Sequence, residues 1–444
     1  MENRKAEIEE SRPLRHYAIM NALPPKRGHH LVKAGRRFAT AGGMFAHLWA
    51  GSFHRILDKI DAGLERGRLE AWLPDGGFRM LGGRAPGPSC EVRLRSWRAL
   101  VRLVTSGSAG WYRAWSVGEW GSPDPVSVFE LFMANAKSLG DVARASGPAR
   151  WVGWAVHALR RNSRNGSRRN IAFHYDLGND FYQLWLDEKM HYSSALFVDP
   201  NDVSEPLDVA QQRKANAVLA RLDLKDADSL LEIGCGWGAL AEVALSRNAL
   251  RYDGLTLSAE QQDYAQKRVA PWSLKGDAQI LLTDYRDMTG QYDAIASVEM
   301  VEAVGQGYWR GYLSAIRRLL KPGGKAALQF ITIDDAIFDR YAANTDFIQA
   351  YIFPGGLLMS ESRFRKLAEA EGLEWRDPLH FGQHYAETLR RWRERFDDVV
   401  QAGKLPASFD ESFVKLWRYY LMYCEGGFRG GGINVMQVTL VNKI

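Results

Sequence analysis

The stretch Leu230–Gly238, LLEIGCGWG, decides the fold, because a short apolar strand runs directly into three closely spaced glycines and the start of a helix. Gly234, Gly236 and Gly238 permit positive φ angles and leave the backbone bare, so a ligand can lie against the main chain at the carboxyl end of the strand. The spacing E-x-G-x-G-x-G differs from the G-x-G-x-x-G of dinucleotide-binding folds, and no lysine follows as in a P-loop. Such glycines also serve as plain turns, so the flanking sequence has to decide.

Strand-like and helix-like segments alternate on both sides of this turn. Alternation of this kind is typical of an α/β fold, in which helices cover both faces of a mostly parallel sheet. Ligands of such sheets lie beyond the carboxyl ends of the strands. The predicted strands span residues 229–233, 252–257, 278–282, 293–298 and 325–332, and the predicted helices span 207–222, 239–246, 259–269 and 309–320.

The amino-terminal part of the chain is predicted to form separate units. Residues 1–43 are basic and have few apolar positions, which favours a flexible or partly helical extension. Residues 44–156 combine strand-like pieces with helical stretches, which predicts a small α+β domain. An arginine-rich linker at 157–170 leads to the main domain at 171–444.

Composition indicates a globular protein with an anionic partner. The chain has 46% hydrophobic and 25% charged residues and a formal net charge of +6. No apolar run approaches the roughly 18 residues of a membrane-spanning helix, and the start is charged rather than signal-like, so we expect a cytoplasmic protein. The three cysteines lie far apart and show no metal-ligand spacing, so no metal site is predicted.

The arginine-rich linker has two interpretations. Arg160, Arg161, Arg164, Arg168 and Arg169 lie in it without an acidic residue, as in a solvated connection or a phosphate-binding surface. The chain also has 15 tryptophans and 11 methionines, and indole rings favour the headgroup level of a membrane, where arginines meet phosphates. We therefore expect the 44–156 domain to associate with lipid, peripherally, at the anionic inner face of the membrane.

Polar residues follow the predicted strands at the edge where a ligand would lie. After the second strand, Thr256 and Gln261 offer groups to a sugar hydroxyl, while Ser258 is also suited to cap the next helix. After the third strand, Asp284 supplies a carboxylate that accepts from an amino group. After the fourth strand, the segment Glu299–Gly305 places a carboxylate at the mouth of the predicted pocket.

Several separate motifs, in the right order, resemble one family. The glycine turn is similar to motif I of S-adenosylmethionine-dependent methyltransferases. Together with it, five further segments resemble cyclopropane-fatty-acyl-phospholipid synthases and mycolic acid methyltransferases over about residues 170–440, with weaker similarity in the amino-terminal domain. These segments are Phe173–Tyr182, Met190–Ala195, Gly254–Ser258, Ile352–Gly356 and Tyr423–Arg429.

The resemblance implies a class I, Rossmann-like methyltransferase domain with a mostly parallel seven-stranded sheet, preceded by the smaller α+β domain. It implies S-adenosylmethionine as cofactor, bicarbonate as a candidate active-site base, and either a monomer or a homodimer. The implied catalytic residues are Glu302, Tyr385, Cys424 and Ser194. The expected cofactor-binding residues are Tyr175, Tyr192, Ser193, Glu232, Gly234, Gly236, Trp237, Gly238, Thr256, Leu257, Ser258, Gln261, Asp284, Tyr285 and Arg286.

Three positions depart from the family's pattern. Ser194 stands where the family has a cysteine, Ile331 where it has a histidine, and Ala303 where a histidine follows the matched glutamate. Losing a ring nitrogen at Ile331 removes a hydrogen-bonding group from the predicted bicarbonate site. Ser194 preserves the backbone donor.

The implied function is methyl transfer to the double bond of an unsaturated acyl chain of a membrane phospholipid. The carbocation that results is deprotonated to a cyclopropane or to a methyl-branched unsaturated chain. Two alternatives stay open: a methyltransferase of the same fold that acts on a small molecule or nucleic acid, and a non-catalytic protein that binds lipid and cofactor. No signature of base methylation is present, so we expect no nucleic-acid partner.

Overall fold

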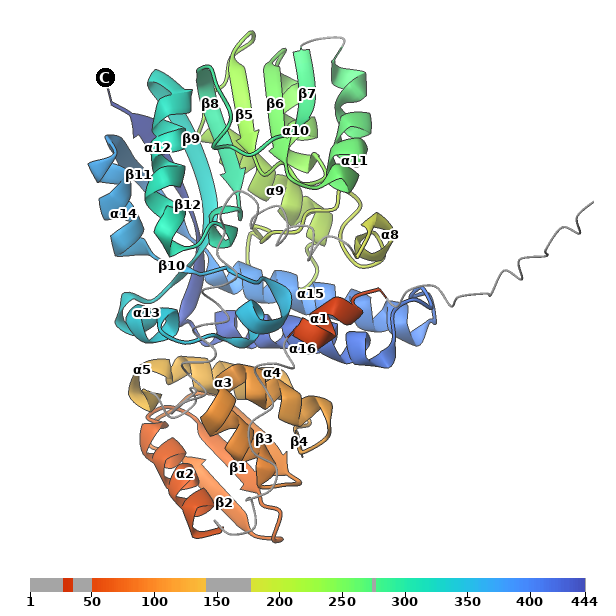
Figure 1. The fold of residues 1–444 in the computed structure, drawn as a ribbon, viewed down its shortest axis with the longest axis vertical. Helices are drawn as coiled ribbons and strands as arrows, with labels where there is room; N and C mark the ends of the chain where they lie inside the picture. The colour runs from red at the N-terminus through yellow and green to blue at the C-terminus, as the bar shows by residue number, and fades with distance from the viewer. Residues whose placement is uncertain (1–26, 35–49, 141–176, 274–276, 444) are drawn as a thin grey trace, which may run out of the picture.

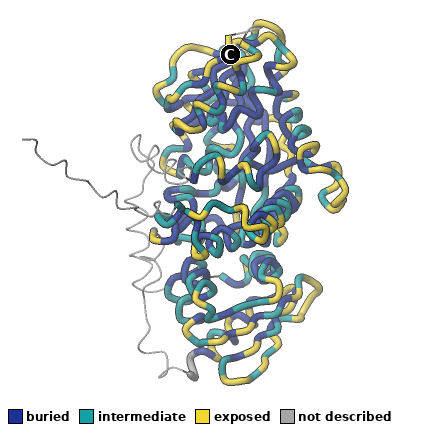
Figure 2. The backbone as a smooth tube through the Cα atoms, turned by 90° about the vertical axis from the view of Figure 1, so that its right-hand side faces the viewer, coloured by how far each residue is buried: buried dark blue, intermediate teal, exposed yellow. Residues whose placement is uncertain are grey.

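The computed structural model describes residues 27–34, 50–140, 177–273 and 277–443. The described elements form three tiers (Figure 1): a large sheet with its helices, a layer of long helices below it, and a smaller sheet domain. Buried residues are concentrated inside the large sheet and the helical layer, whereas exposed residues follow the loops (Figure 2).

The large sheet has the order β11-β12-β9-β8-β5-β6-β7, with β10 paired to β9. The five strands from β5 to β9 run parallel to their neighbours, and β12 lies antiparallel between β9 and β11. This confirms the prediction of a mostly parallel sheet with seven strands. The two-residue strand β10, which pairs with β9, is an addition to these seven. The strands are β5 Ser229–Ile233, β6 Arg251–Thr256, β7 Asp277–Leu282, β8 Tyr292–Val298, β9 Leu320–Ile333, β10 Met359–Ser360, β11 Leu373–His380 and β12 Ile433–Asn442.

Helices cover both faces of the large sheet because its central strand is apolar on both sides. Every residue of β5 is buried. Leu231 and Ile233 join the core beneath α12 and α14, whereas Leu230 joins the core beneath α9, α10 and α11. Burial on both faces favours apolar residues at successive positions, which explains Leu230, Leu231 and Ile233. The helices are α8 Asn179–Tyr182, α9 Leu207–Ala220, α10 Ala239–Arg247, α11 Ala259–Val269, α12 Trp309–Leu319, α13 Asp335–Ala342 and α14 Glu361–Ala370, with short turns η3 Ala270–Trp272, η4 Val301–Ala303, η5 Gln306–Tyr308 and η6 Ile348–Ile352.

Within residues 50–140, the amino-terminal domain has a four-stranded sheet of order β2-β1-β3-β4 and four helices. This sheet with its helices agrees with the α+β character expected from the strand-like and helical pieces of this part of the chain. Its elements are α2 Ala50–Gly63, β1 Arg68–Trp72, β2 Phe78–Gly82, β3 Ser89–Leu94, α3 Arg98–Ser116, β4 Trp120–Gly121, α4 Pro125–Ala134 and α5 Ala136–Leu139.

The layer of long helices joins the two domains. It contains α15 Gly382–Gln401 and α16 Glu411–Arg429, which pack along each other, and α4 packs on the other side of α16. The backbones of α4 and α16 approach closely, since a Cβ atom on Gly426 would lie 2.5 Å from the Cβ of Phe129. The amino-terminal domain is therefore docked on the helix that carries Cys424.

Part of the extension that was expected to be flexible or partly helical forms a short packed helix. Helix α1 His29–Ala34 packs against α16, with Leu31 fully buried, and Arg27 forms an ion pair of 2.6 Å with Asp180. Residues 27–34 thus belong to the packed structure. The predicted linker at 157–170 and the rest of the extension lie outside the described residues. Among the described helices, none is long and apolar enough to span a bilayer.

Candidate active site

A cavity of about 510 Å³ runs from the large sheet to the amino-terminal domain. Its polar end lies at the carboxyl ends of β5, β6 and β8, where Gly234, Thr256 and Glu299 line it. Its apolar end is lined by residues of α3, α4 and α5, among them Leu103 and Phe132. The cavity thus joins the predicted cofactor site to a hydrophobic space between the domains.

The glycine turn forms one wall of the polar end. Gly234, Gly236 and Gly238 have φ angles of 83°, 53° and 80°, which are in the region that favours glycine. A Cβ atom on Gly236 would meet nothing within 4 Å, so the backbone here borders open space. A ligand the size of a nucleoside can lie against this main chain, as S-adenosylmethionine requires.

The end of β6 contributes a polar pair rather than three independent ligand groups. Thr256 donates its hydroxyl hydrogen to Gln261 Oε1 over 2.8 Å, and both residues line the cavity with Leu257. Ser258 does not line it: its hydroxyl accepts from the Gln261 amide at 3.3 Å and caps α11. Ser258 therefore caps α11, as one of its two interpretations predicted. It does not line the cavity, so it is not placed to contact a ligand there.

Asp284 lines the cavity, but its carboxylate already has a partner. Arg286 donates Nη2 to Asp284 Oδ2 at 2.5 Å and Nε to Oδ1 at 2.8 Å. A carboxylate has about four acceptor positions, so Asp284 keeps capacity for an adenine amino group while Arg286 fixes its orientation. Tyr285 lies next to them in the wall.

A buried lysine that sequence reasoning missed lies among the predicted cofactor residues. Lys214 on α9 donates Nζ to the Ser193 hydroxyl at 2.7 Å, and the Ser193 backbone carbonyl accepts from Gln211. Burial lowers the pKa of Lys214 to about 8, whereas burial raises the pKa of Glu232, which accepts from the Tyr252 hydroxyl, to about 7. The sequence did contain a signal for this lysine: Lys214 lies at helical spacing from Gln211 and Val218, on the buried face of α9.

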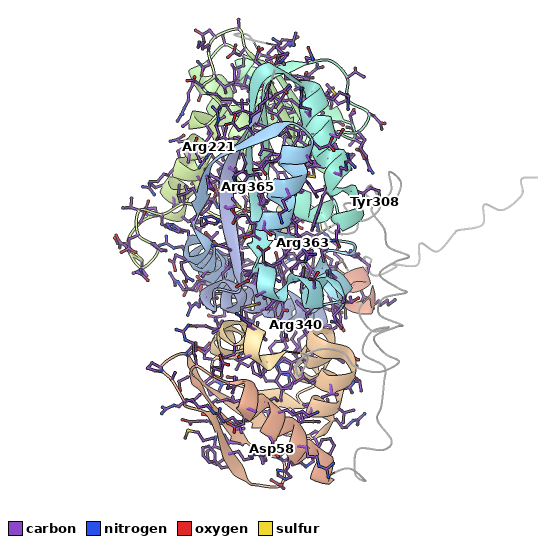
Figure 3. All side chains as sticks on the ribbon, turned by 90° about the vertical axis from the view of Figure 1, so that its left-hand side faces the viewer. Asp58, Arg221, Tyr308, Arg340, Arg363 and Arg365 are labelled. Atoms are coloured by element: carbon purple, nitrogen blue, oxygen red, sulfur yellow. The ribbon has the colours of Figure 1, made fainter. Side chains whose placement is uncertain are left out.

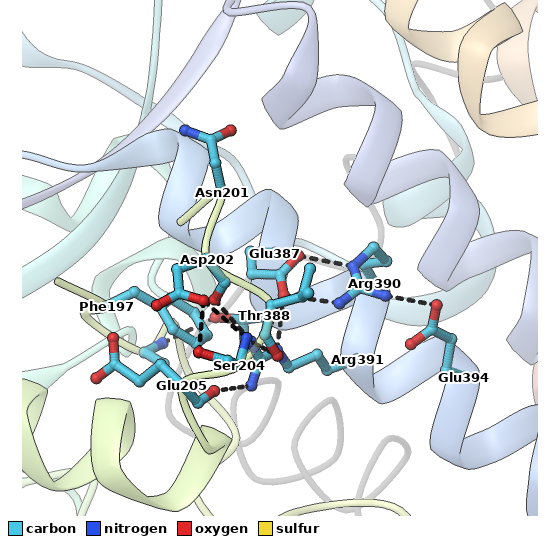
Figure 4. Close-up of polar contacts among 12 residues, drawn as sticks. Phe197, Asn201, Asp202, Ser204, Glu205, Glu387, Thr388, Arg390, Arg391 and Glu394 are labelled. Atoms are coloured by element: carbon cyan, nitrogen blue, oxygen red, sulfur yellow. Dashed lines mark hydrogen bonds and ion pairs between the residues drawn. The ribbon is translucent and has the colours of Figure 1, made fainter. Parts of the chain in front are cut away.

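The loop that carries Ser193 and Ser194 is held against α15. The Ala195 amide donates to the Thr388 hydroxyl at 3.1 Å, and the Phe197 amide donates to His384 Nδ1 at 3.0 Å. Further along the loop, Arg391 of α15 bridges Glu387 and the Glu205 backbone (Figure 4). These contacts fix the position of the Ser194 backbone amide.

Glu299, which the sequence analysis did not single out, lies at the centre of the polar contacts below β8. Its Oε1 accepts from the Ser194 amide and from Gln329 Nε2, both at 2.8 Å, and its Oε2 accepts from the Tyr385 hydroxyl at 2.6 Å. Burial raises the pKa of Glu299, while Tyr385, Gln329, Ser194 and Lys214 lower it. The carboxylate is thus an acceptor held by three donors at the cavity wall.

Glu302 lies one turn further along the same segment. Its Oε1 accepts from the Ile331 amide at 2.5 Å, and among the described residues its buried Oε2 has no hydrogen-bond partner. Burial and the neighbouring Glu299 raise the pKa of Glu302 to about 8. At neutral pH Glu302 is therefore mostly a neutral carboxylic acid, and it presents a donor to the cavity.

The predicted bicarbonate site is already filled by a side chain. Two groups expected to hold the ion, the Ser194 amide and the Tyr385 hydroxyl, instead hold Glu299. Ile331 contributes only its backbone amide, to Glu302. The residues present therefore do not fit a bicarbonate ion at these donors.

Most of the predicted residues meet in the cavity. Cys424 lines it, and burial raises the pKa of its thiol, which disfavours the thiolate form. Ser194, Gly238 and Ser258 lie outside the lining, and Tyr175 lies outside the described residues. The predicted residues in the lining are Tyr192, Ser193, Glu232, Gly234, Gly236, Trp237, Thr256, Leu257, Gln261, Asp284, Tyr285, Arg286, Glu302, Tyr385 and Cys424.

This sheet and this glycine turn define a class I S-adenosylmethionine-dependent methyltransferase. The family model for mycolic acid cyclopropane synthetase matches residues 162–438, and the chain belongs to that family. It is a C-methyltransferase of the cyclopropane-fatty-acid synthase type with S-adenosylmethionine as its cofactor.

Relatives and solved structures agree with this assignment. The chain is 39% identical to the tuberculostearic acid methyltransferase UfaA1 of Mycobacterium tuberculosis over 355 residues, which cover 77% of this chain and 81% of that protein. It is 38% identical to the cyclopropane-fatty-acyl-phospholipid synthase of Escherichia coli K12, over 60% of this chain and 66% of that protein. The structure of the cyclopropane synthase MmaA2 from Mycobacterium tuberculosis matches 62% of this chain and 98% of its own at 29% identity, with a TM-score of 0.57. The mycolic acid cyclopropane synthase CmaA1, complexed with SAH, matches with the same score at 31% identity.

Proposed function

We propose that the protein transfers a methyl group from S-adenosylmethionine to the double bond of an unsaturated fatty acyl chain of a membrane phospholipid. The observation that carries this proposal is the continuity of the cavity. Its polar end has the glycine turn, and its other end has Leu103, Phe132 and further apolar side chains of the amino-terminal domain. An apolar wall suits an acyl chain, whereas a charged substrate would find no polar partner at this end.

The bound sulfonium supplies an electrophilic methyl group. The chain's own residues position the two reactants and exclude water: Ser193, Lys214 and the glycine turn border the cofactor end, and Tyr385 and Phe353 border the space beyond it. The double bond's electron pair forms the new bond to carbon, and the positive charge on the chain is lost with a proton. Removal from the new methyl closes a ring, and removal from a neighbouring carbon leaves a methyl-branched alkene.

Peripheral contact with a membrane is part of the proposal. An aromatic pair, Trp72 on β1 opposite Phe78 on β2, is about half exposed at 47% and 46%, with Met80 beside it at 52%. Exposed indole and thioether groups on one sheet support insertion at headgroup level. The arginine-rich linker at 157–170 would add contacts to anionic lipid.

The test is labelling of lipid by the purified protein. Vesicles of unsaturated phospholipid are incubated with S-adenosylmethionine that carries a labelled methyl group, and the fatty acids are analysed by mass spectrometry. We expect label in the acyl chains, and none with saturated phospholipid of the same headgroup. Fragmentation separates a ring from a methyl-branched alkene of equal mass. Label in neither lipid, with the cofactor bound, would contradict the proposal and favour a non-catalytic binding protein.

A further inference from the structure

Glu299 has a backbone conformation that needs an explanation. Its φ angle is 50°, in the region that glycine favours and that costs other residues free energy. The residue directly follows β8, and its amide donates to the Gln329 carbonyl at 2.7 Å. The strained turn places the carboxylate in the cavity wall, where it meets three donors, rather than in solvent.

The side-chain amide of Gln329, which donates to Glu299, is oriented by a chain of hydrogen bonds that begins at Arg221. Arg221, which follows α9 and is labelled in Figure 3, donates Nε to Gln437 Oε1 at 3.1 Å. Gln437 Nε2 donates to Gln329 Oε1 at 3.0 Å, and Gln329 Nε2 donates to Glu299 at 2.8 Å. Since a guanidinium can only donate, every amide in this chain of bonds has one permitted orientation, and its last N–H must point at Glu299.

Burial raises the pKa of Glu299, and three donors and one lysine counteract this by favouring its ionised form. The Ser194 amide and the Tyr385 hydroxyl also donate to it, and Lys214 on α9 adds positive charge. The nearest competing acid, Glu302, has its pKa raised to about 8 by burial and by Glu299 itself. Of the two carboxyl groups, Glu299 has the three donors and the nearby lysine that favour an anion, whereas Glu302 is mostly the neutral acid at neutral pH.

We propose that Glu299 is a built-in general base of this enzyme, and that its carboxylate replaces a bound bicarbonate ion. This inference rests on the proposed function. After methyl transfer, Glu299 takes the proton from the cationic acyl chain, and the C–H electron pair closes the ring or forms the new double bond. The neutral carboxylic acid then releases its proton to water when the product leaves. One sulfonium and one alkene thus give one thioether, one methylated product and one proton.

The first experiment compares three proteins in buffer freed of carbon dioxide and in buffer with added bicarbonate. Wild type is expected to turn over equally fast in both. Glu299→Gln keeps the shape but removes the base, and we expect a loss of about 100-fold or more that bicarbonate does not restore. Glu299→Gly suits the positive φ angle and vacates a space beside three donors, so its loss should be partly restored by bicarbonate or formate.

The second experiment measures binding without turnover. Line broadening of ¹³C-bicarbonate in NMR, with S-adenosylhomocysteine present, should be seen with Glu299→Gly and not with wild type. Bicarbonate bound by wild type, or wild-type turnover that requires it, would overturn the inference while leaving the proposed function intact. If wild type modifies no lipid under either condition, the proposed function fails, and the binding comparison still decides whether Glu299 fills the anion site.

Asp253 provides a matched control. It is a buried carboxylate that accepts from the Tyr292 hydroxyl at 2.6 Å and from Gln279 Nε2 at 2.7 Å, outside the cavity lining. Asp253→Asn should lower stability without changing the bicarbonate dependence or the pH profile. Gln437→Leu tests the positioning role of the amide chain, because loss of the fixed Gln329 donor should shift the acid limb of the activity profile to higher pH. An unchanged limb in Gln437→Leu would contradict that role.

Discussion

At the scale of the residue, Glu302 couples protonation to stability. Its pKa rises from about 4.5 to about 8 on folding because of burial and the charge of Glu299. The folded state thus holds a proton that the unfolded state has lost between these pH values. The contribution of Glu302 is fully favourable below about pH 4.5 and is lost as the pH rises through about 8.

Replacement of Glu302 by Gln should remove this dependence. We expect the melting temperature of Glu302→Gln to fall less between pH 5 and pH 8 than that of wild type, while Glu232, whose pKa is about 7, keeps a residual slope in both. Activity should fall at least about 10-fold and the affinity for S-adenosylhomocysteine should stay within about twofold, because Glu302 accepts from the Ile331 amide of β9 and follows β8 rather than the glycine turn. Calorimetry across the pH range measures the first effect. A wild-type slope in the variant would show that Glu302 is not the titrating group.

At the scale of the element, the crossing of α4 and α16 depends on glycine. A Cβ atom on Gly426 would lie 2.5 Å from the Phe129 Cβ and 2.6 Å from the Val126 carbonyl oxygen, so the helices would have to separate. We expect Gly426→Ala to lower the free energy of unfolding by about 1–3 kcal/mol, as for other overpacked interiors. The readout is urea denaturation.

Gly311 on α12 is the matched control for this substitution. It is exposed and in a helix, and a Cβ atom there would meet nothing within 4 Å. Gly311→Ala should therefore stabilise the protein by about 1 kcal/mol through helix propensity. Effects of opposite sign on the free energy of unfolding at the two positions distinguish steric crowding between the helices from the helix propensity of alanine. Stabilisation by Gly426→Ala would contradict the close approach of the helices.

The sequence predicted well the bounds of helices and strands that have a clear hydrophobic pattern. Helix α11 has the predicted bounds, and β5 does too, because the apolar run and the glycine turn are local signals. Strands β4 and β10, of two residues each, were not predicted, since pairing with β3 and β9 alone defines them. Register across the sheet, which sets Gln437 opposite Gln329, is likewise a property of the pairing and not of either strand.

At the scale of the whole molecule, the cavity crosses from one domain to the other. Leu103 of α3 is 4% exposed and lines the apolar end, far along the chain from the glycine turn. We expect Leu103→Trp to lower kcat/KM for long acyl chains by about 10-fold or more while leaving short chains and cofactor binding nearly unchanged. Assays on phospholipids of graded chain length measure this. Equal losses for all lengths would indicate damage to the fold rather than a shorter cavity.

The class of fold, the glycine turn and most of the residues that line the polar end of the cavity could be predicted from the sequence alone. Those features are local: the strand before the turn is short and mostly apolar, and polar residues follow the strand ends, which meet at one edge of a parallel sheet. The positions of buried polar residues, such as Lys214 in α9 and Gln329 in β9, could also be inferred from the pattern of residues around them. The residues with which they form hydrogen bonds could not be inferred in this way.

The surroundings of the two carboxyl groups depend on the folded structure. Glu299 and Glu302 are three residues apart, and sequence reasoning selected Glu302. The two carboxyl groups differ in their hydrogen-bond partners. Ser194, Gln329 and Tyr385 donate to Glu299, whereas one oxygen of Glu302 has no partner among the described residues. Charge state depends on burial and on neighbours brought together by folding, and no local pattern of residues encodes such a meeting.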